Sequence, residues 1–179
     1  MLMSAAQSCL LVVDMQARLV PSMAAPRTVV DNARILIEAA TRLNVPLLVS
    51  EQYPRGLGPT IPELATLVPA DLKVKMHFSC IGDTNFAARF RAIGRRQAIV
   101  AGVEAHVCVL QTVEDLLASG TETFVVADAT SSRTEKNHEA AMERLRGAGA
   151  RIVTTEMVVF EWLAKAGTPE FKELSALIK

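Results

Sequence analysis

The sequence predicts an α/β fold: a mostly parallel sheet of about six strands with helices on both faces. Two observations predict it. Short apolar runs alternate with longer segments of helical periodicity, and glycines stand where helices are expected to end. Strands that are apolar on both faces are typical of parallel sheets covered on each side. The alternation also implies right-handed crossovers between parallel strands.

The individual elements follow from these patterns. Buried strands are expected at residues 10–13, 45–49, 98–101, 124–127 and 151–154, with a weaker strand at 71–75. Helical stripes are expected at residues 28–43, 85–93, 106–118, 135–145 and 160–164. Gly94, Gly120, Gly147 and Gly149 are expected to cap helices or form the turns after them. Without a repeat or a linker, residues 1–179 are expected to form one domain.

Composition narrows the class of partner. The chain has 19 basic and 19 acidic residues and only 4% aromatic residues, which gives no reason to bind nucleic acid or an anionic membrane. Its three cysteines form no C-x-x-C pair, so a reducing, cytoplasmic setting is expected. A small molecule is therefore the expected partner, with no cofactor.

One long irregular segment stands out at residues 53–69, with four prolines and two glycines. It follows the carboxyl end of a predicted strand, which is the edge where open α/β sheets hold their ligands. Two interpretations remain open: a lid over an active site, or an ordinary surface loop.

Three residues that can carry chemistry follow different strands. Asp14 comes directly after the first apolar run, where a carboxylate is costly unless it faces a polar site. Cys108 lies in the opening turn of a helix, whose positive end can lower a thiol pKa. Lys75 ends the weak strand. Each also has an ordinary interpretation: a capping aspartate, a packed cysteine and a solvated lysine. Their common position at the carboxyl strand ends favours a shared site.

Three segments carry a resemblance to a known superfamily: VVDMQ at residues 12–16, KMHFS at 75–79 and GVEAHVCVLQT at 102–112. The whole chain resembles the isochorismatase-like cysteine hydrolases. Residues 51–58 and 104–108 look most like the subgroup of isochorismatase domain-containing proteins. The resemblance implies a three-layer, Rossmann-like fold with strand order 3-2-1-4-5-6. It also implies homo-oligomers whose interface often lies beside the pocket.

The resemblance also implies the roles of particular residues. Asp14, Lys75 and Cys108 inherit the positions of a catalytic triad. Backbone N–H groups of Glu104 and Cys108 are expected to form the oxyanion hole, with a cis peptide bond between Val103 and Glu104. A cis bond that does not precede proline is costly, so it is expected only as retained strain at a functional site.

A substrate pocket is expected around this triad. Its expected lining residues are Gln16, Glu51, Tyr53, Phe78 and His106. For Glu51 and Tyr53 a simple strand-end turn is the alternative, and Phe78 could equally belong to the core.

One departure from the superfamily pattern bears on metal binding. Metal-dependent nicotinamidases carry Asp-x-His after the second strand, whereas residues 50–53 read Ser-Glu-Gln-Tyr. No metal site is expected, and nicotinamide is disfavoured as the substrate. The predicted function is a metal-independent cysteine hydrolase that cleaves a small amide, imide or N-carbamoyl compound through an acyl–cysteine intermediate. Two alternatives remain: isochorismatase-type vinyl-ether cleavage, and a redox-responsive thiol protein without hydrolytic activity.

Overall fold

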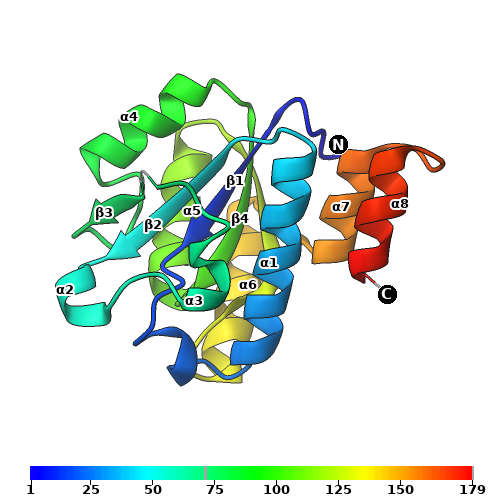
Figure 1. The fold of residues 1–179 in the computed structure, drawn as a ribbon. Helices are drawn as coiled ribbons and strands as arrows, with labels where there is room; N and C mark the ends of the chain where they lie inside the picture. Colours follow the sequence, from blue (N-terminus) through cyan, green and yellow to red (C-terminus); the bar gives the residue numbers. More distant parts are fainter. Residues whose placement is uncertain (71, 179) are drawn as a thin grey trace.

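The computed structural model describes residues 1–70 and 72–178. Its sheet has six parallel strands in the order β3-β2-β1-β4-β5-β6 (Figure 1), which confirms the predicted fold class and strand order. The strands are β1 (Ser8–Val13), β2 (Leu47–Gln52), β3 (Lys73–Lys75), β4 (Gln97–Val103), β5 (Glu122–Ser131) and β6 (Arg151–Val153). The expected start of the weak strand, Asp71, lies outside the described residues.

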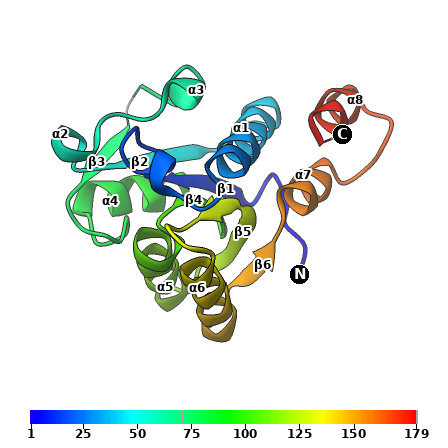
Figure 2. The same ribbon diagram turned by 90° about the horizontal axis from the view of Figure 1, so that it is seen from below.

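Helices cover both faces of the sheet (Figure 2). On one face lie α1 (Pro26–Arg42) and α7 (Thr155–Leu163), and α8 (Pro169–Ser175) packs beside α7. On the other face lie α4 (Thr84–Ile93), α5 (Leu110–Ala118) and α6 (Glu135–Ala148). Both chain termini lie on the side of α7 and α8, at opposite ends of these helices (Figure 1). In the part of the chain that the structure describes, no helix is long and apolar enough to cross a membrane.

Alternation along the central strands divides the core in two. In β1, Leu10 and Val12 join the cluster under α1 and α7, whereas Leu11 and Val13 join the cluster under α4, α5 and α6. All six residues of β1 are buried. A strand with two buried faces is held firmly in register, because a slip by one residue would exchange its two faces. The position of the carboxyl end of β1 in the sheet is therefore well defined.

Helix boundaries depart from the predicted ones where capping decides them. The side chain of Thr154 accepts a hydrogen bond from the Met157 N–H, so α7 begins earlier than expected. Gly147 lies inside α6 rather than at its end, and Gly149 takes the left-handed cap position with φ of 106°. The last helix, α8, was not predicted; Thr168 caps it and Pro169 opens it.

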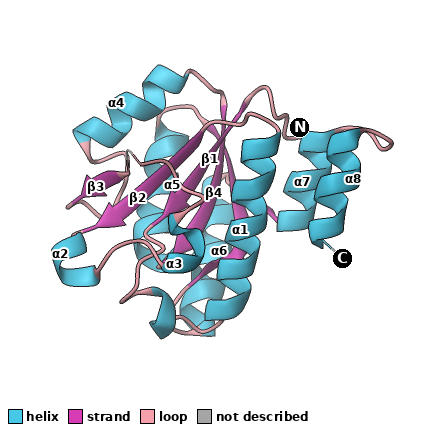
Figure 3. Cartoon of the chain, in the orientation of Figure 1, coloured by secondary structure: helices cyan, strands magenta, loops and turns pink. Residues whose placement is uncertain are grey.

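The irregular segment after β2 contains two short helical turns, α2 (Pro54–Leu57) and α3 (Pro62–Ala65) (Figure 3). Gln16 and Thr60 form an antiparallel bridge across it. The segment is thus attached to the chain just after β1, at the carboxyl edge of the sheet.

Candidate active site

Three neighbouring strands end in residues with left-handed backbone conformations. The φ angles are 53° at Asp14 after β1, 36° at Tyr53 after β2, and 57° at Glu104 after β4. This region is rarely adopted by residues other than glycine, and such strained residues cluster at functional sites. Because β2, β1 and β4 are consecutive in the sheet, the three turns belong to one edge. The candidate site lies at this edge of the sheet.

Asp14 is a buried carboxylate with both oxygens engaged. Its Oδ1 accepts a hydrogen bond from Ser50 Oγ at 2.7 Å, and its Oδ2 accepts one from Lys75 Nζ at 2.8 Å. Both side chains of the Asp14–Lys75 pair have zero exposure. Charge-assisted hydrogen bonds of this length stabilise the ionised carboxylate in a site without solvent.

Lys75 is the last residue of the edge strand β3, yet it is buried while its neighbour Val74 is 53% exposed. Its ammonium also donates to Gln52 Oε1 at 2.7 Å and to the carbonyls of Phe78 and His77 at 3.0 and 3.2 Å. Burial alone lowers the pKa of Lys75, but the Asp14 carboxylate and two nearby cysteine sulfur atoms more than offset this, so the pKa is raised. Lys75 is therefore a fixed cation.

Cys108 lies beside this ion pair, in the π-helical turn η2 (Ala105–Val109) that precedes α5. Only 4% of the residue is exposed. Burial raises the pKa of Cys108 above the usual thiol range; the Asp14 carboxylate adds to this, and the Lys75 ammonium opposes it. The sequence suggested a thiol pKa lowered by the helix end. The structure differs because desolvation and an adjacent anion dominate.

The turn between β4 and η2 contains no cis peptide bond, so the prediction of one between Val103 and Glu104 is wrong. In the described residues every peptide bond is trans. The chain reverses instead through positive φ angles, 129° at Gly102 and 57° at Glu104, which supply the sharp turn without isomerisation. The N–H of Val107 donates to the Glu104 carbonyl at 2.8 Å and closes the turn.

Gly102 brings the ends of β1 and β4 into close contact. A Cβ atom there would lie 2.1 Å from the Val13 oxygen and 2.6 Å from the Val13 nitrogen. Gly102→Ala is expected to lower the free energy of unfolding by about 2–4 kcal/mol, measured by urea denaturation. The control is Gly147→Ala, which meets no atom within 4 Å and is expected to stabilise α6 by about 0.5–1 kcal/mol. Equal stability of wild type and Gly102→Ala would contradict the close approach.

Two of the expected pocket residues, Gln16 and Glu51, hold the segment after β2. The Gln16 amide donates to the carbonyls of Gln52 and Gly58 at 3.0 and 2.6 Å, and its oxygen accepts from the Gln52 N–H at 2.7 Å. Glu51 Oε1 accepts from the Thr60 N–H and hydroxyl at 2.6 and 2.8 Å. Both side chains are buried. These contacts fasten the segment after β2 to the carboxyl edge of the sheet.

The other expected pocket residues are more open. Tyr53 and Phe78 are 48% and 54% exposed, and only the carbonyl of Phe78 contacts the ion pair. His106 is half-buried on η2, with Nδ1 3.0 Å from Ser132 Oγ and Nε2 3.4 Å from Asn137 Nδ2. His106 therefore faces the start of α6.

The sequence reasoning did not assign Ser50 and Gln52 to the ion pair. Both belong to β2 at alternate positions, so they share the face that meets Asp14 and Lys75. The alternation along β2 was the available signal. These residues stand where metal-dependent nicotinamidases carry Asp-x-His, and their side chains are engaged by the ion pair, so they do not fit a zinc site. In the described ranges, no group of three or more His, Cys, Asp or Glu could hold a metal ion.

The loop after β3 is anchored to α5. Ser79 Oγ donates to Asp115 Oδ2 at 2.6 Å, and the Cys80 N–H donates to Thr112 Oγ1 at 2.9 Å. Thr112 Oγ1 donates in turn to the Cys108 carbonyl at 2.7 Å. The segment whose carbonyls surround Lys75 is thus joined to the helix that carries Cys108.

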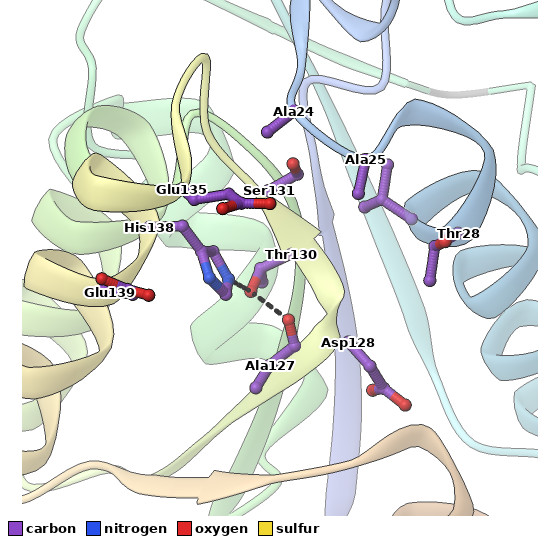
Figure 4. Close-up of a pocket in the computed structure, with 11 residues that line it drawn as sticks. Ala24, Ala25, Thr28, Ala127, Asp128, Thr130, Ser131, Glu135, His138 and Glu139 are labelled. Carbon is purple, nitrogen blue, oxygen red and sulfur yellow. Dashed lines mark hydrogen bonds between the residues drawn. The ribbon is translucent and has the colours of Figure 1, made fainter.

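A separate cavity of about 210 Å³ lies between α1, β5 and α6 (Figure 4). His138 Nε2 lies 3.1 Å from Thr130 Oγ1, which donates to the Ala127 carbonyl. Burial lowers the pKa of His138, so the ring is neutral at neutral pH. None of the predicted site residues lines this cavity.

Comparisons with known proteins agree with this fold. The Isochorismatase domain family matches residues 8–157. Isochorismatase domain-containing protein 2 of Danio rerio is 39% identical over 174 residues, or 96% of this chain and 86% of that protein. The MAR1 ribonuclease structure from Caenorhabditis elegans has a TM-score of 0.92 and 33% identity, covering 99% of this chain and 92% of that one. YcaC from Escherichia coli, an octameric hydrolase of unknown specificity, has a TM-score of 0.91 and 26% identity, covering 98% and 89%. This chain therefore belongs to the isochorismatase-like hydrolase family.

Proposed function

We propose that this protein is a metal-independent cysteine hydrolase that cleaves a small amide, imide or N-carbamoyl compound through an acyl–cysteine intermediate. One observation carries the proposal: the Cys108 thiol lies beside the Asp14 carboxylate, which forms a buried ion pair with Lys75. A thiol, a base and a cation in one desolvated site are the components of nucleophilic acyl transfer.

In the first half of the reaction, Cys108 is the nucleophile and Asp14 the base. The raised pKa of Cys108 keeps its proton in the resting state, so Asp14 removes it as the sulfur attacks the carbonyl carbon. A C–S bond forms, and the carbonyl electron pair moves to oxygen. Lys75 stays protonated throughout, and its charge offsets the negative charge shared by the sulfur and the carboxylate.

The developing oxyanion requires hydrogen-bond donors. We assign this role to the backbone N–H groups of Glu104 and Cys108, which border the turn between β4 and α5. Loss of one such donor typically raises the barrier by about 2.7–4 kcal/mol. When the tetrahedral intermediate collapses, the C–N bond breaks and the leaving amine takes the proton from Asp14.

The second half of the reaction regenerates the thiol. Asp14 takes a proton from a water molecule, whose oxygen attacks the thioester carbonyl. The C–S bond then breaks, the sulfur recovers the proton, and a carboxylic or carbamic acid leaves. Water and the amide are thus converted to an acid and an amine, with no redox change.

The charge balance of the site favours an uncharged reacting group. The Lys75 ammonium already donates toward four oxygen acceptors. The ammonium therefore has no N–H group left to bind a substrate carboxylate. The dianionic substrate of isochorismatase-type cleavage, in contrast, needs cations to bind its two carboxylates. This observation favours amide-type chemistry over the vinyl-ether alternative. RNA, the substrate class named for the C. elegans relative, is disfavoured by the balanced charge and scarce aromatic residues.

We also propose that the protein is a homo-oligomer. The side chains of Tyr53, Val74, Met76 and Phe78 are between 48% and 65% exposed. They gather around the edge strand β3, close to Lys75. An exposed apolar surface beside a site is typical of a contact surface, and the E. coli relative is octameric.

The proposed reaction is tested by trapping the intermediate. A panel of small amides, imides and N-carbamoyl compounds is incubated with the protein and quenched in acid, and peptides are analysed by mass spectrometry. A thioester on Cys108, together with loss of turnover in Cys108→Ala, is the expected result. Cys9→Ala is the control, because Cys9 is a fully buried cysteine of β1 that is given no part in the reaction.

Other outcomes of this experiment identify the alternatives. Turnover of a vinyl ether that survives in Cys108→Ser but not in Asp14→Asn would replace the proposal by isochorismatase-type cleavage. A stable sulfenic acid on Cys108 without turnover of any compound would replace it by the redox-responsive thiol.

A further inference from the structure

The side chain of Glu104 has one oxygen without a hydrogen-bond donor. Its Oε1 lies 3.0 Å from Arg133 Nε in an ion pair, whereas its Oε2 is buried and has no hydrogen-bond partner. The side chain is only 9% exposed. A buried carboxylate oxygen without a donor is unfavourable and rarely retained without a function. The proposed function uses only the backbone of this residue.

The group that approaches this oxygen is the ring of His106, whose Nδ1 lies 3.5 Å from Glu104 Oε2. The amide of Asn137 faces the other ring nitrogen, and the Ser132 hydroxyl lies 3.0 Å from Nδ1. An Asn137 amide that donates to Nε2 leaves Nδ1 as the ring nitrogen that faces Ser132 and Glu104. The ring is thus oriented from two sides against the Glu104 carboxylate.

Arg133 pairs a permanent positive charge with the Glu104 carboxylate. It lies between β5 and α6, so its ion pair connects the turn after β4 to the next strand of the sheet. Glu104 itself holds a left-handed conformation with φ of 57°. Because Arg133 holds the Glu104 side chain, it restricts the backbone rotation of this strained residue. The direction of the Glu104 N–H is restricted with it.

The charge of Glu104 also matters for the reaction. A carboxylate near a developing oxyanion repels it, and the repulsion is strong where water is excluded. The guanidinium of Arg133, whose side chain is 59% exposed, lies 3.0 Å from the Glu104 carboxylate and offsets its charge.

We propose that Arg133 and the Glu104 side chain are positioning residues for the oxyanion hole: Arg133 neutralises the buried Glu104 carboxylate and holds the Glu104 N–H in its donor direction. This inference rests on the proposed function, since it assigns a purpose to the proposed oxyanion donor.

The test compares two reactions of the same thiol. p-Nitrophenyl acetate acylates Cys108 through a tetrahedral oxyanion, forming a C–S bond and releasing p-nitrophenolate. Iodoacetamide alkylates the thiol by displacing iodide, without an oxyanion. Arg133→Met is expected to slow acylation by roughly tenfold or more, because it leaves the Glu104 charge uncompensated, and to change alkylation much less.

Companion variants separate charge from packing. Glu104→Gln keeps the shape and removes the charge, so it is expected to acylate within about threefold of wild type. The double variant Glu104→Gln/Arg133→Met is expected to recover most of the acylation rate lost in Arg133→Met, and Arg133→Lys to retain it. A loss of packing alone would not be rescued by Glu104→Gln. The control is Arg144→Met, which removes an exposed ion pair of α6 with Glu114 and is expected to leave both rates unchanged.

The outcomes distinguish this inference from the proposed function. Wild type that forms no acyl–Cys108, with Cys108→Ala as background, overturns both. Normal acylation of Cys108 in wild type and in Arg133→Met overturns the positioning role alone. Equal slowing of acylation and alkylation in Arg133→Met also overturns it, because the effect would then act on the thiol.

Discussion

Replacing Asp14 by asparagine is expected to slow turnover while making Cys108 easier to alkylate. Turnover is expected to fall by about a hundred- to ten-thousandfold, the usual contribution of a general base. Alkylation by iodoacetamide at pH 7 is expected to rise roughly tenfold, since a shift of one pKa unit changes the thiolate fraction by that factor. The two rates are measured on the same preparation, by product formation and by mass spectrometry.

The opposite signs follow from the electrostatics of the resting site. The Asp14 carboxylate raises the pKa of Cys108, and the Lys75 ammonium lowers it. Asparagine removes the effect of the carboxylate and leaves that of the Lys75 ammonium, which favours the Cys108 thiolate. In wild type, alkylation is expected to increase only above the roughly 8.5 of a free thiol, and in Asp14→Asn the curve moves to lower pH.

The matched control is Asp31→Asn, which makes the same chemical change on an exposed residue of α1. Neither rate is expected to change there. If Asp14→Asn slows alkylation and turnover together, Asp14 assists ionisation of the Cys108 thiol in the resting state. The proposed mechanism, in which Cys108 keeps its proton until the sulfur attacks, is then wrong.

The fold could be predicted from the sequence because its signal is local and repeated. The run at residues 8–13 is buried on both faces, and similar runs return after each helical stripe. Because connections between parallel strands are right-handed, a repeated strand–helix pattern is compatible with only a few arrangements of the sheet. The positions of Asp14, Lys75 and Cys108 after strands followed from the same pattern. The resemblance implied their roles as a triad, and the structure brings Lys75 and Cys108 beside Asp14.

The electrostatic state of the site could not be predicted, because it depends on contacts between distant segments. A cysteine at the start of a helix suggests a lowered pKa, but the burial of Cys108 and its distance from Asp14 are tertiary properties. The same holds for Ser50, which meets Asp14 across 36 positions of sequence. The close approach of Gly102 to Val13 is likewise a contact between distant segments, which no local pattern reveals.

Lys75→Met is expected to lower the free energy of unfolding by about 3–5 kcal/mol, because it leaves Asp14 charged, buried and unpaired. The measurement is urea denaturation at neutral pH. Methionine fills a similar volume, so the loss is electrostatic rather than a cavity. The control, Arg27→Met, removes a cation whose side chain is 95% exposed and is expected to leave the stability unchanged.

The double variant Asp14→Asn/Lys75→Met tests whether the two charges act as a pair. Removing both is expected to make the protein more stable than Lys75→Met alone by about 1–3 kcal/mol, because no isolated charge is then buried. Recovery to wild type is not expected, since Gln52 and the carbonyls of His77 and Phe78 still lack the ammonium donor. If Lys75→Met proves as stable as the double variant, Asp14 is not an ion-paired carboxylate in the folded chain. The base that the proposed reaction assigns to Asp14 would then have to be sought elsewhere.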